Sequence, residues 1–181
     1  WGTTIQNTNN TVGSGNGTSF ACPNMAGLAA CLWQGFPEVS NMRIIQALRL
    51  AGSNVQAPND RMGYGIPDLK KAFLFLLKEQ TTLTASAQNC GTSISWTSKD
   101  AGGMRYEIER KTSADADFKP LSQLTVSALN FDKRVYQFTD PLSDQPTGKV
   151  EYRIRQVIDT AAATLTSFYI DTATVSLQMA C

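Results

Sequence analysis

The sequence contains no histidine. It therefore has no imidazole for a Ser-His-Asp triad, a Cys-His dyad or a histidine metal site. Charged residues are also few and balanced in sign: the sequence has 16 Lys and Arg and 15 Asp and Glu, which gives a formal net charge of +1. Without a basic excess or a basic run, we expect no nucleic-acid partner.

Long hydrophobic runs are absent as well. The longest apolar run, Ala72–Leu77, is far too short to span a bilayer. A hydrophobic content of 42% with 17% charged residues predicts a folded core rather than disorder. The chain begins at Trp1 without a signal-peptide pattern, so we expect a processed or excised piece of a longer polypeptide.

Cysteine is limited to four residues, none in a C-x-x-C spacing, so neither a zinc motif nor a thioredoxin-like motif is predicted. We expect no metal and no cofactor in this chain. Cys22 and Cys31 fall in one predicted helix. Their separation of about 13 Å is too long for a disulfide, and we expect both to be buried. Cys90 and Cys181 remain as a candidate disulfide pair.

The first 80 residues are rich in Gly, Ala, Asn and Leu and predict three helices: Ser19–Gln34, Ser40–Ala51 and Pro67–Glu79. Small apolar residues favour a buried helix for the first. Ser40 suits the N-cap of the second, and Pro67 suits the first helical position of the third. Before them, we expect a strand end or surface loop over Trp1–Thr11 and a glycine loop over Val12–Thr18.

The remaining residues alternate apolar and polar side chains in short segments separated by turn residues. Six strands are predicted: Thr82–Ala87, Ser93–Thr97, Arg105–Lys111, Val135–Thr139, Glu151–Val157 and Thr166–Leu177. Six or seven such strands in about 100 residues are typical of an antiparallel sandwich. Lys78–Thr81 would link the two parts.

The chemistry of the chain is indicated by Gly17-Thr18-Ser19. Glycines allow a sharp turn and the approach of a substrate. A serine at a helix N-terminus lies beside free N–H groups that stabilise an oxyanion. The same three residues also suit a plain helix cap, which is the commoner role of such residues.

The longer string Gly17-Thr18-Ser19-Phe20-Ala21-Cys22-Pro23-Asn24-Met25-Ala26-Gly27 resembles the catalytic-serine signature of the subtilisin-like serine proteases. That signature is G-T-S-x-A-x-P-x-x-A-G, and every fixed position matches. Phe36-Pro37, Ser40-Asn41 and Gly63–Asp68 resemble later segments of the same family. The resemblance covers about residues 1–79.

The resemblance implies a role for each residue of the motif. Ser19 would be the nucleophile for a protein or peptide substrate, and its own N–H would be one oxyanion donor. Thr18 matches the position that supports the oxyanion hole. Gly17, Asn16 and Phe20 would form the loop along which the substrate approaches. The implied reaction is acyl transfer from a peptide bond.

In this family the aspartate, the histidine and the oxyanion-hole asparagine lie upstream of the serine, whereas only 18 residues precede Ser19. We expect this chain alone to be inactive as a protease. Any structural calcium would belong to the missing segment. The apolar helix over Phe20–Trp33 predicts a partner: the missing N-terminal segment as a nicked chain, another copy, or the chain's own sandwich.

The second half resembles the fibronectin type III-like modules of secreted bacterial enzymes, on Trp96, Tyr106–Lys111 and Glu151–Val157. Trp96 would be the core tryptophan. The charges of the two segments predict a solvent-facing cross-strand ladder. The aromatic residues Tyr106, Phe118 and Phe138 suit core packing or, as an alternative, a carbohydrate-binding platform.

The predicted fold is thus an α/β remnant of a subtilase domain over residues 1–79, followed by an all-β antiparallel fibronectin type III-like sandwich over residues 80–181. Two functions remain open. The chain is part of a secreted subtilisin-like serine endopeptidase, or it is a non-catalytic accessory fragment processed from one. The expected location is secreted or extracellular, the periplasm and cell surface included, and a Cys90–Cys181 disulfide would support it.

Overall fold

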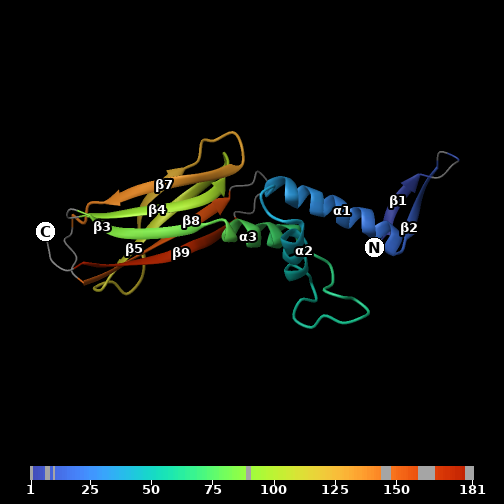
Figure 1. Cartoon of the computed structure of the whole chain (residues 1–181), viewed down its shortest axis with the longest axis horizontal. Helices are drawn as coiled ribbons and strands as arrows, with labels where there is room; N and C mark the ends of the chain where they lie inside the picture. The colour runs from blue at the N-terminus through green and yellow to red at the C-terminus, as the bar shows by residue number, and fades with distance from the viewer. Residues whose placement is uncertain are drawn as a thin grey trace. The chain divides into compact units, whose positions relative to one another are not determined.

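The computed structural model describes residues 2–6, 9, 11–88, 91–143, 148–158 and 166–177. The chain divides into two compact units, Trp1–Leu76 and Leu77–Cys181. Both are drawn in Figure 1, and each is treated by itself. The first unit carries a hairpin and helices, and the second consists mainly of antiparallel strands.

The first unit opens with a β-hairpin. Strand β1 (Gly2–Gln6) pairs antiparallel with β2 (Val12–Asn16), with Gly2 opposite Asn16 and Gln6 opposite Val12. The prediction of a glycine loop over Val12–Thr18 is therefore wrong. Pairing with β1 holds the glycine-rich segment extended despite the low strand propensity of glycine.

Three helices follow: α1 (Thr18–Gly35), α2 (Asn41–Leu50) and α3 (Leu69–Glu79). Ser40 caps α2 as predicted, since its side chain accepts a hydrogen bond from the Arg43 N–H. Helix α3 begins later than predicted. The Asp68 carboxylate accepts a hydrogen bond from the Lys71 N–H at 3.0 Å. Asp68 therefore caps the N-terminus of α3, and Pro67 lies outside the helix. The helix runs through Glu79, which leaves a shorter linker than the predicted Lys78–Thr81.

The core of the first unit comes mainly from α2, α3 and the segment between α1 and α2. Phe36 is fully buried, and its ring centroid lies 5.2 Å from that of Phe73. Helix α1 adds Leu32 as its one buried residue in the described part of the chain. The prediction of a buried α1 is therefore wrong, and Cys22 and Cys31 are exposed and unpaired rather than buried.

The second unit contains seven strands: β3 (Thr82–Gln88), β4 (Gly91–Asp100), β5 (Met104–Thr112), β6 (Lys119–Thr125), β7 (Asp132–Asp140), β8 (Gly148–Ile158) and β9 (Thr166–Leu177). They form two antiparallel sheets, in the orders β3-β4-β7 and β6-β5-β8-β9 (Figure 1). All six predicted strands are present. The seventh, β6, was missed because Pro120 is unfavourable in a strand and the segment lacks strict alternation of apolar and polar residues. Its pairing with β5 shifts register at Ile108/Glu109.

Aromatic rings fill the centre of the second unit. Trp96 is buried as predicted, with its ring centroid 5.4 Å from that of Tyr106 and 5.4 Å from that of Tyr136. Tyr106 is fully buried and Phe138 packs against the same core, so neither contributes to an exposed carbohydrate platform. The hydrophobic core that these rings share with the aliphatic side chains makes this part a β-sandwich.

Two buried aspartates connect the sheets. Asp100 at the end of β4 accepts hydrogen bonds from the Tyr106 hydroxyl and, at 2.7 Å, from Arg134. Asp140 at the end of β7 accepts the Tyr152 hydroxyl at 2.8 Å and Arg110 at 2.9 Å. Since each tyrosine belongs to the opposite sheet, both carboxylates hold the layers together. No sequence pattern predicted this role for either aspartate.

Candidate active site

Ser19 lies in the first turn of α1, immediately after the hairpin, and its side chain is exposed. The connection turns at Gly17, whose φ of 128° and ψ of 168° lie in a region open to glycine alone. A Cβ at Gly17 would meet no atom within 4 Å. The backbone conformation, rather than lack of space, therefore requires glycine and leaves the approach to Ser19 open.

The N-terminus of α1 is uncapped. The Phe20 and Ala21 N–H groups donate to the Gly17 carbonyl at 3.2 and 3.3 Å. For the N–H groups of Thr18 and Ser19, no acceptor lies in the described part of the chain, and no side chain caps the helix. Two free donors and the positive end of the helix dipole thus lie beside the Ser19 hydroxyl, which is the arrangement that favours an oxyanion.

Phe20 fixes the hairpin to the helix. Its ring packs over Gly15 of β2 so closely that a Cβ at Gly15 would lie 2.8 Å from the ring. The structure thus places Phe20 between the hairpin and α1. Asn16 is the last residue of β2, and its side chain lies outside the described atoms. Thr18 is exposed next to Ser19.

Among the described residues, no side chain hydrogen-bonds to the Ser19 hydroxyl. The chain has no histidine that could serve as the base of a Ser-His-Asp triad. Nor does the described part of the chain contain a cluster of residues able to hold a metal ion. The described residues therefore bring together a serine hydroxyl and two N–H donors, in a chain without histidine.

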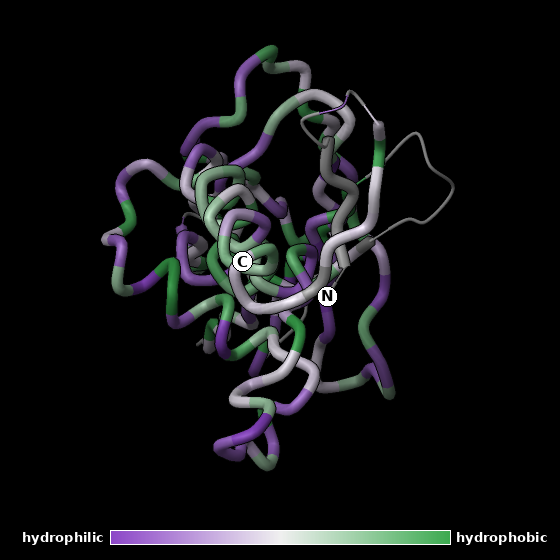
Figure 2. Tube along the Cα trace, turned by 90° about the vertical axis from the view of Figure 1, so that its right-hand side faces the viewer, coloured by the Kyte–Doolittle hydropathy of each residue, from purple (hydrophilic) through white to green (hydrophobic). Residues whose placement is uncertain are grey.

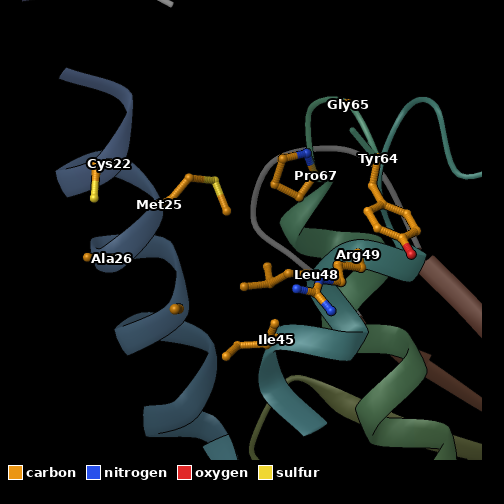
Figure 3. A pocket seen from close by; sticks show the side chains of 10 residues that line it. Cys22, Met25, Ala26, Ile45, Leu48, Arg49, Tyr64, Gly65 and Pro67 are labelled. Carbon is orange, nitrogen blue, oxygen red and sulfur yellow. The ribbon is translucent and has the colours of Figure 1, made fainter. Parts of the chain in front are cut away.

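Helix α1 leaves an apolar surface uncovered next to this site. In Figure 2, where α1 is seen nearly end-on, its turns are drawn mostly in white and green, the colours of neutral and hydrophobic residues. A groove of about 490 Å³ separates one face of α1, with Met25 and Ala26, from Ile45 and Leu48 of α2 (Figure 3). Tyr64, Gly65 and Pro67, from the segment before α3, also line the groove.

The charged ladder predicted for the second unit is present. On the face of β5 and β8, Glu107 pairs with Arg155 and Glu109 pairs with Arg153. The ladder is less solvent-exposed than predicted, since Glu109 is 9% exposed. The guanidinium of Arg153 lies 4.1 Å from the Phe118 ring centroid and 4.3 Å from that of Tyr169. The aromatic residues thus cover an arginine, a contact that the sequence pattern did not indicate.

Cys90 and Cys181 lie outside the described residues, so their disulfide stays a prediction. Among the helices of the described residues, none has the length and apolar character required to cross a membrane.

Comparison with known proteins relates the first unit to one family. The model of the subtilase family matches residues 2–65, which include the whole candidate site. This match supports a relationship to subtilisin-like serine peptidases. No curated protein matches the chain.

Similarity to solved structures is weak. The pectate lyase Pel3 from Pectobacterium carotovorum aligns at 19% identity and a TM-score of 0.39, over 55% of this chain and 27% of that one. A penta-heme cytochrome c552 from Thermochromatium tepidum aligns at 8% identity and a TM-score of 0.35, over 76% of this chain and 50% of that one. The chain thus spans about a quarter of the length of Pel3. At these scores neither likeness supports a functional conclusion.

Proposed function

We propose that the first unit is the serine-bearing segment of a secreted subtilisin-like endopeptidase, with Ser19 as nucleophile. The observation that carries the proposal is the exposed Ser19 hydroxyl beside the free N–H groups of Thr18 and Ser19, inside a segment matched by the family model. A plain helix cap is disfavoured because the Thr18 and Ser19 side chains make no capping hydrogen bond.

In the proposed reaction, the Ser19 Oγ attacks the carbonyl carbon of a peptide bond while a base removes the hydroxyl proton. The carbonyl oxygen becomes an oxyanion that accepts a hydrogen bond from the Ser19 N–H, and the Thr18 hydroxyl supports this oxyanion hole. The proton then passes to the leaving amine, and water releases the acyl group from Ser19. Because this chain has no histidine, the base and its orienting aspartate come from a separate polypeptide segment.

The uncovered face of α1 supports such a partner. A helix that is apolar on most sides normally packs on several elements, whereas α1 buries only Leu32 among its described residues. The groove lined by Met25, Ala26, Ile45 and Leu48 begins one turn beyond Ser19. A segment that docks there would cover apolar surface and would bring its histidine close to the Ser19 hydroxyl.

Labelling with a fluorophosphonate serine probe tests the proposal. Purified material is first analysed by intact mass for a second chain beside the 19.7 kDa species. With the second chain bound, we expect one label on Ser19. The Ser19→Ala variant should lose the label, and Ser14→Ala, which alters an exposed serine of β2, should keep it.

Two outcomes would contradict the catalytic proposal. An unlabelled Ser19 in the presence of the histidine-bearing chain would show that the motif is not an active nucleophile. A lone, unlabelled 19.7 kDa species would show that this molecule is the non-catalytic fragment, whatever its parent does.

For the second unit we propose a fibronectin type III-like accessory module. Its support is a sandwich of three and four antiparallel strands in the orders β3-β4-β7 and β6-β5-β8-β9, with Trp96 buried between the sheets. Nuclear Overhauser contacts between the backbones of β4 and β7, and of β5 and β8, test this pairing. Backbone pairing of β4 with β8 would contradict the module.

A further inference from the structure

Among the described strands of the second unit, one sheet edge stays open. Of the four edge strands, β6 carries Pro120 and a shifted register, both of which discourage further pairing. Strands β3 and β9 contact each other where the two sheets meet. Strand β7 pairs with β4 without a register shift, from Asp132 opposite Asp100 to Asp140 opposite Thr92. Its other edge has no partner strand in the described part of the chain.

The side chains of β7 suit an additional strand. The strand contains neither proline nor glycine, and its charged residues lie at its ends. At its centre Val135 is 68% exposed. An exposed valine on an unpaired edge without a bulge is a feature that natural sheets usually avoid, since it favours pairing with another chain.

The sequence of β7 is complementary to itself in one antiparallel register. With Val135 opposite Val135 of a second copy, Lys133 lies opposite Gln137, and Arg134 lies opposite Tyr136. No like charges then face each other. This register also keeps inward-facing residues on the inward side, because opposite residues in an antiparallel pair point to the same face.

The neighbouring registers are unfavourable. A pairing centred on Tyr136 sets Asp132 opposite Asp140, and a pairing centred on Arg134 sets two arginines opposite each other. Like charges directly opposite one another destabilise a strand pair. The charge pattern therefore favours the register centred on Val135 over the registers on either side of it, and only this register places the two exposed valines opposite each other.

We propose that β7 binds β7 of a second copy of this chain, antiparallel and with Val135 on the two-fold axis. The pairing joins two three-stranded sheets into one continuous six-stranded sheet, in an interface in which both copies use the same surface. This proposal is independent of the chemistry of Ser19.

Sedimentation velocity of the full chain, from low micromolar to millimolar concentration, tests the proposal. We expect a monomer–dimer equilibrium. Val135→Lys places two lysines opposite each other and should raise the dimer dissociation constant about tenfold or more. Thr139→Lys adds the same charge to the same exposed face beyond the paired residues and should leave the constant unchanged. Matching circular dichroism spectra would show that both variants fold.

Hydrogen exchange separates this interface from association through α1. Amides of residues 132–138 should exchange more slowly as the concentration of the wild-type chain rises, and this effect should vanish in Val135→Lys. A monomer at all concentrations would overturn the proposal. So would a dimer that survives Val135→Lys but is lost in Ala26→Lys, which alters the exposed face of α1.

Discussion

The backbone of Gly17 determines where the Ser19 hydroxyl lies. Its φ of 128° and ψ of 168° link the last residue of β2 to the first turn of α1. An alanine in this conformation costs about 1–3 kcal/mol. We therefore expect Gly17→Ala to lower the free energy of unfolding of the first unit by that amount, as measured by urea denaturation, and to abolish probe labelling of Ser19.

Gly27 offers a matched control for this substitution. It lies inside α1, and a Cβ at this position would meet nothing within 4 Å. Because glycine is a poor helix former, Gly27→Ala should raise the free energy of unfolding by about 0.5–1 kcal/mol. Equal stability of the two variants would show that Gly17 does not need its unusual backbone conformation.

Asp140 supports three groups at the end of β7. Besides Tyr152 and Arg110, its carboxylate accepts the N–H of Leu142, the one non-glycine residue with positive φ in the described part of the chain. Asp140→Asn removes the negative charge that pairs with the partly buried Arg110 and should cost about 3 kcal/mol in urea denaturation. Asp132→Asn, at the exposed start of the same strand, should cost less than about 0.5 kcal/mol. Similar losses in both variants would contradict this role.

Among the elements, β8 depends on a stacked arginine. Arg153 pairs with Glu109 and lies between the rings of Phe118 and Tyr169, so it connects β8 to β5, to the loop before β6 and to β9. We expect Arg153→Ala to lower the free energy of unfolding by about 1–2 kcal/mol. Lys149→Ala removes a more exposed ion pair of the same strand and should cost less than about 0.5 kcal/mol. Equal effects of the two substitutions, measured by urea denaturation, would show that the stacking adds nothing.

The tyrosines between the sheets make the sandwich sensitive to alkali. Burial, the largest cause, raises the pKa of Tyr106, Tyr136 and Tyr152 above the ordinary value of 10.0. Between the unfolded and the folded pKa, the folded state holds more protons than the unfolded state, so the free energy of unfolding falls as pH rises. Their contribution is complete below about pH 10 and is lost progressively above it.

Urea denaturation at several pH values between about 9 and 12 measures this effect. The fall in stability should coincide with the tyrosinate absorbance of the unfolding chain. Tyr136→Phe removes one of the three groups and should make the fall shallower. A stability that stays constant above pH 10 would contradict the proposed linkage.

Local signals predicted the elements well, and contacts between distant residues explain the errors. Ser40 marked the start of α2, and strict alternation marked six of the seven strands. Strand β6 was missed because its pairing with β5 overrides an unfavourable Pro120. The candidate site could be predicted from the sequence because the residues of the Ser19 motif are contiguous. The stacking around Arg153 could not be predicted, because it joins residues far apart in the sequence.

The whole molecule combines two units with unequal cores. The second unit buries large side chains such as Trp96, Tyr106 and Tyr152 in one continuous core. In the first unit, α1 has one buried residue among those described and borders a groove of about 490 Å³. Since buried apolar contacts largely set local stability, we expect the units to unfold separately, the first at lower urea concentration.

Hydrogen exchange followed by mass spectrometry measures this difference. Amides of α1 should exchange at lower urea concentration than those of β4, β5 and β8. Asp140→Asn should speed exchange in the strands and leave α1 unchanged, because its contacts lie in the second unit. Binding of the histidine-bearing segment proposed above should slow exchange in α1 and have little effect on exchange in the strands. Simultaneous exchange of helix and strands in one transition would show that the two units fold as one.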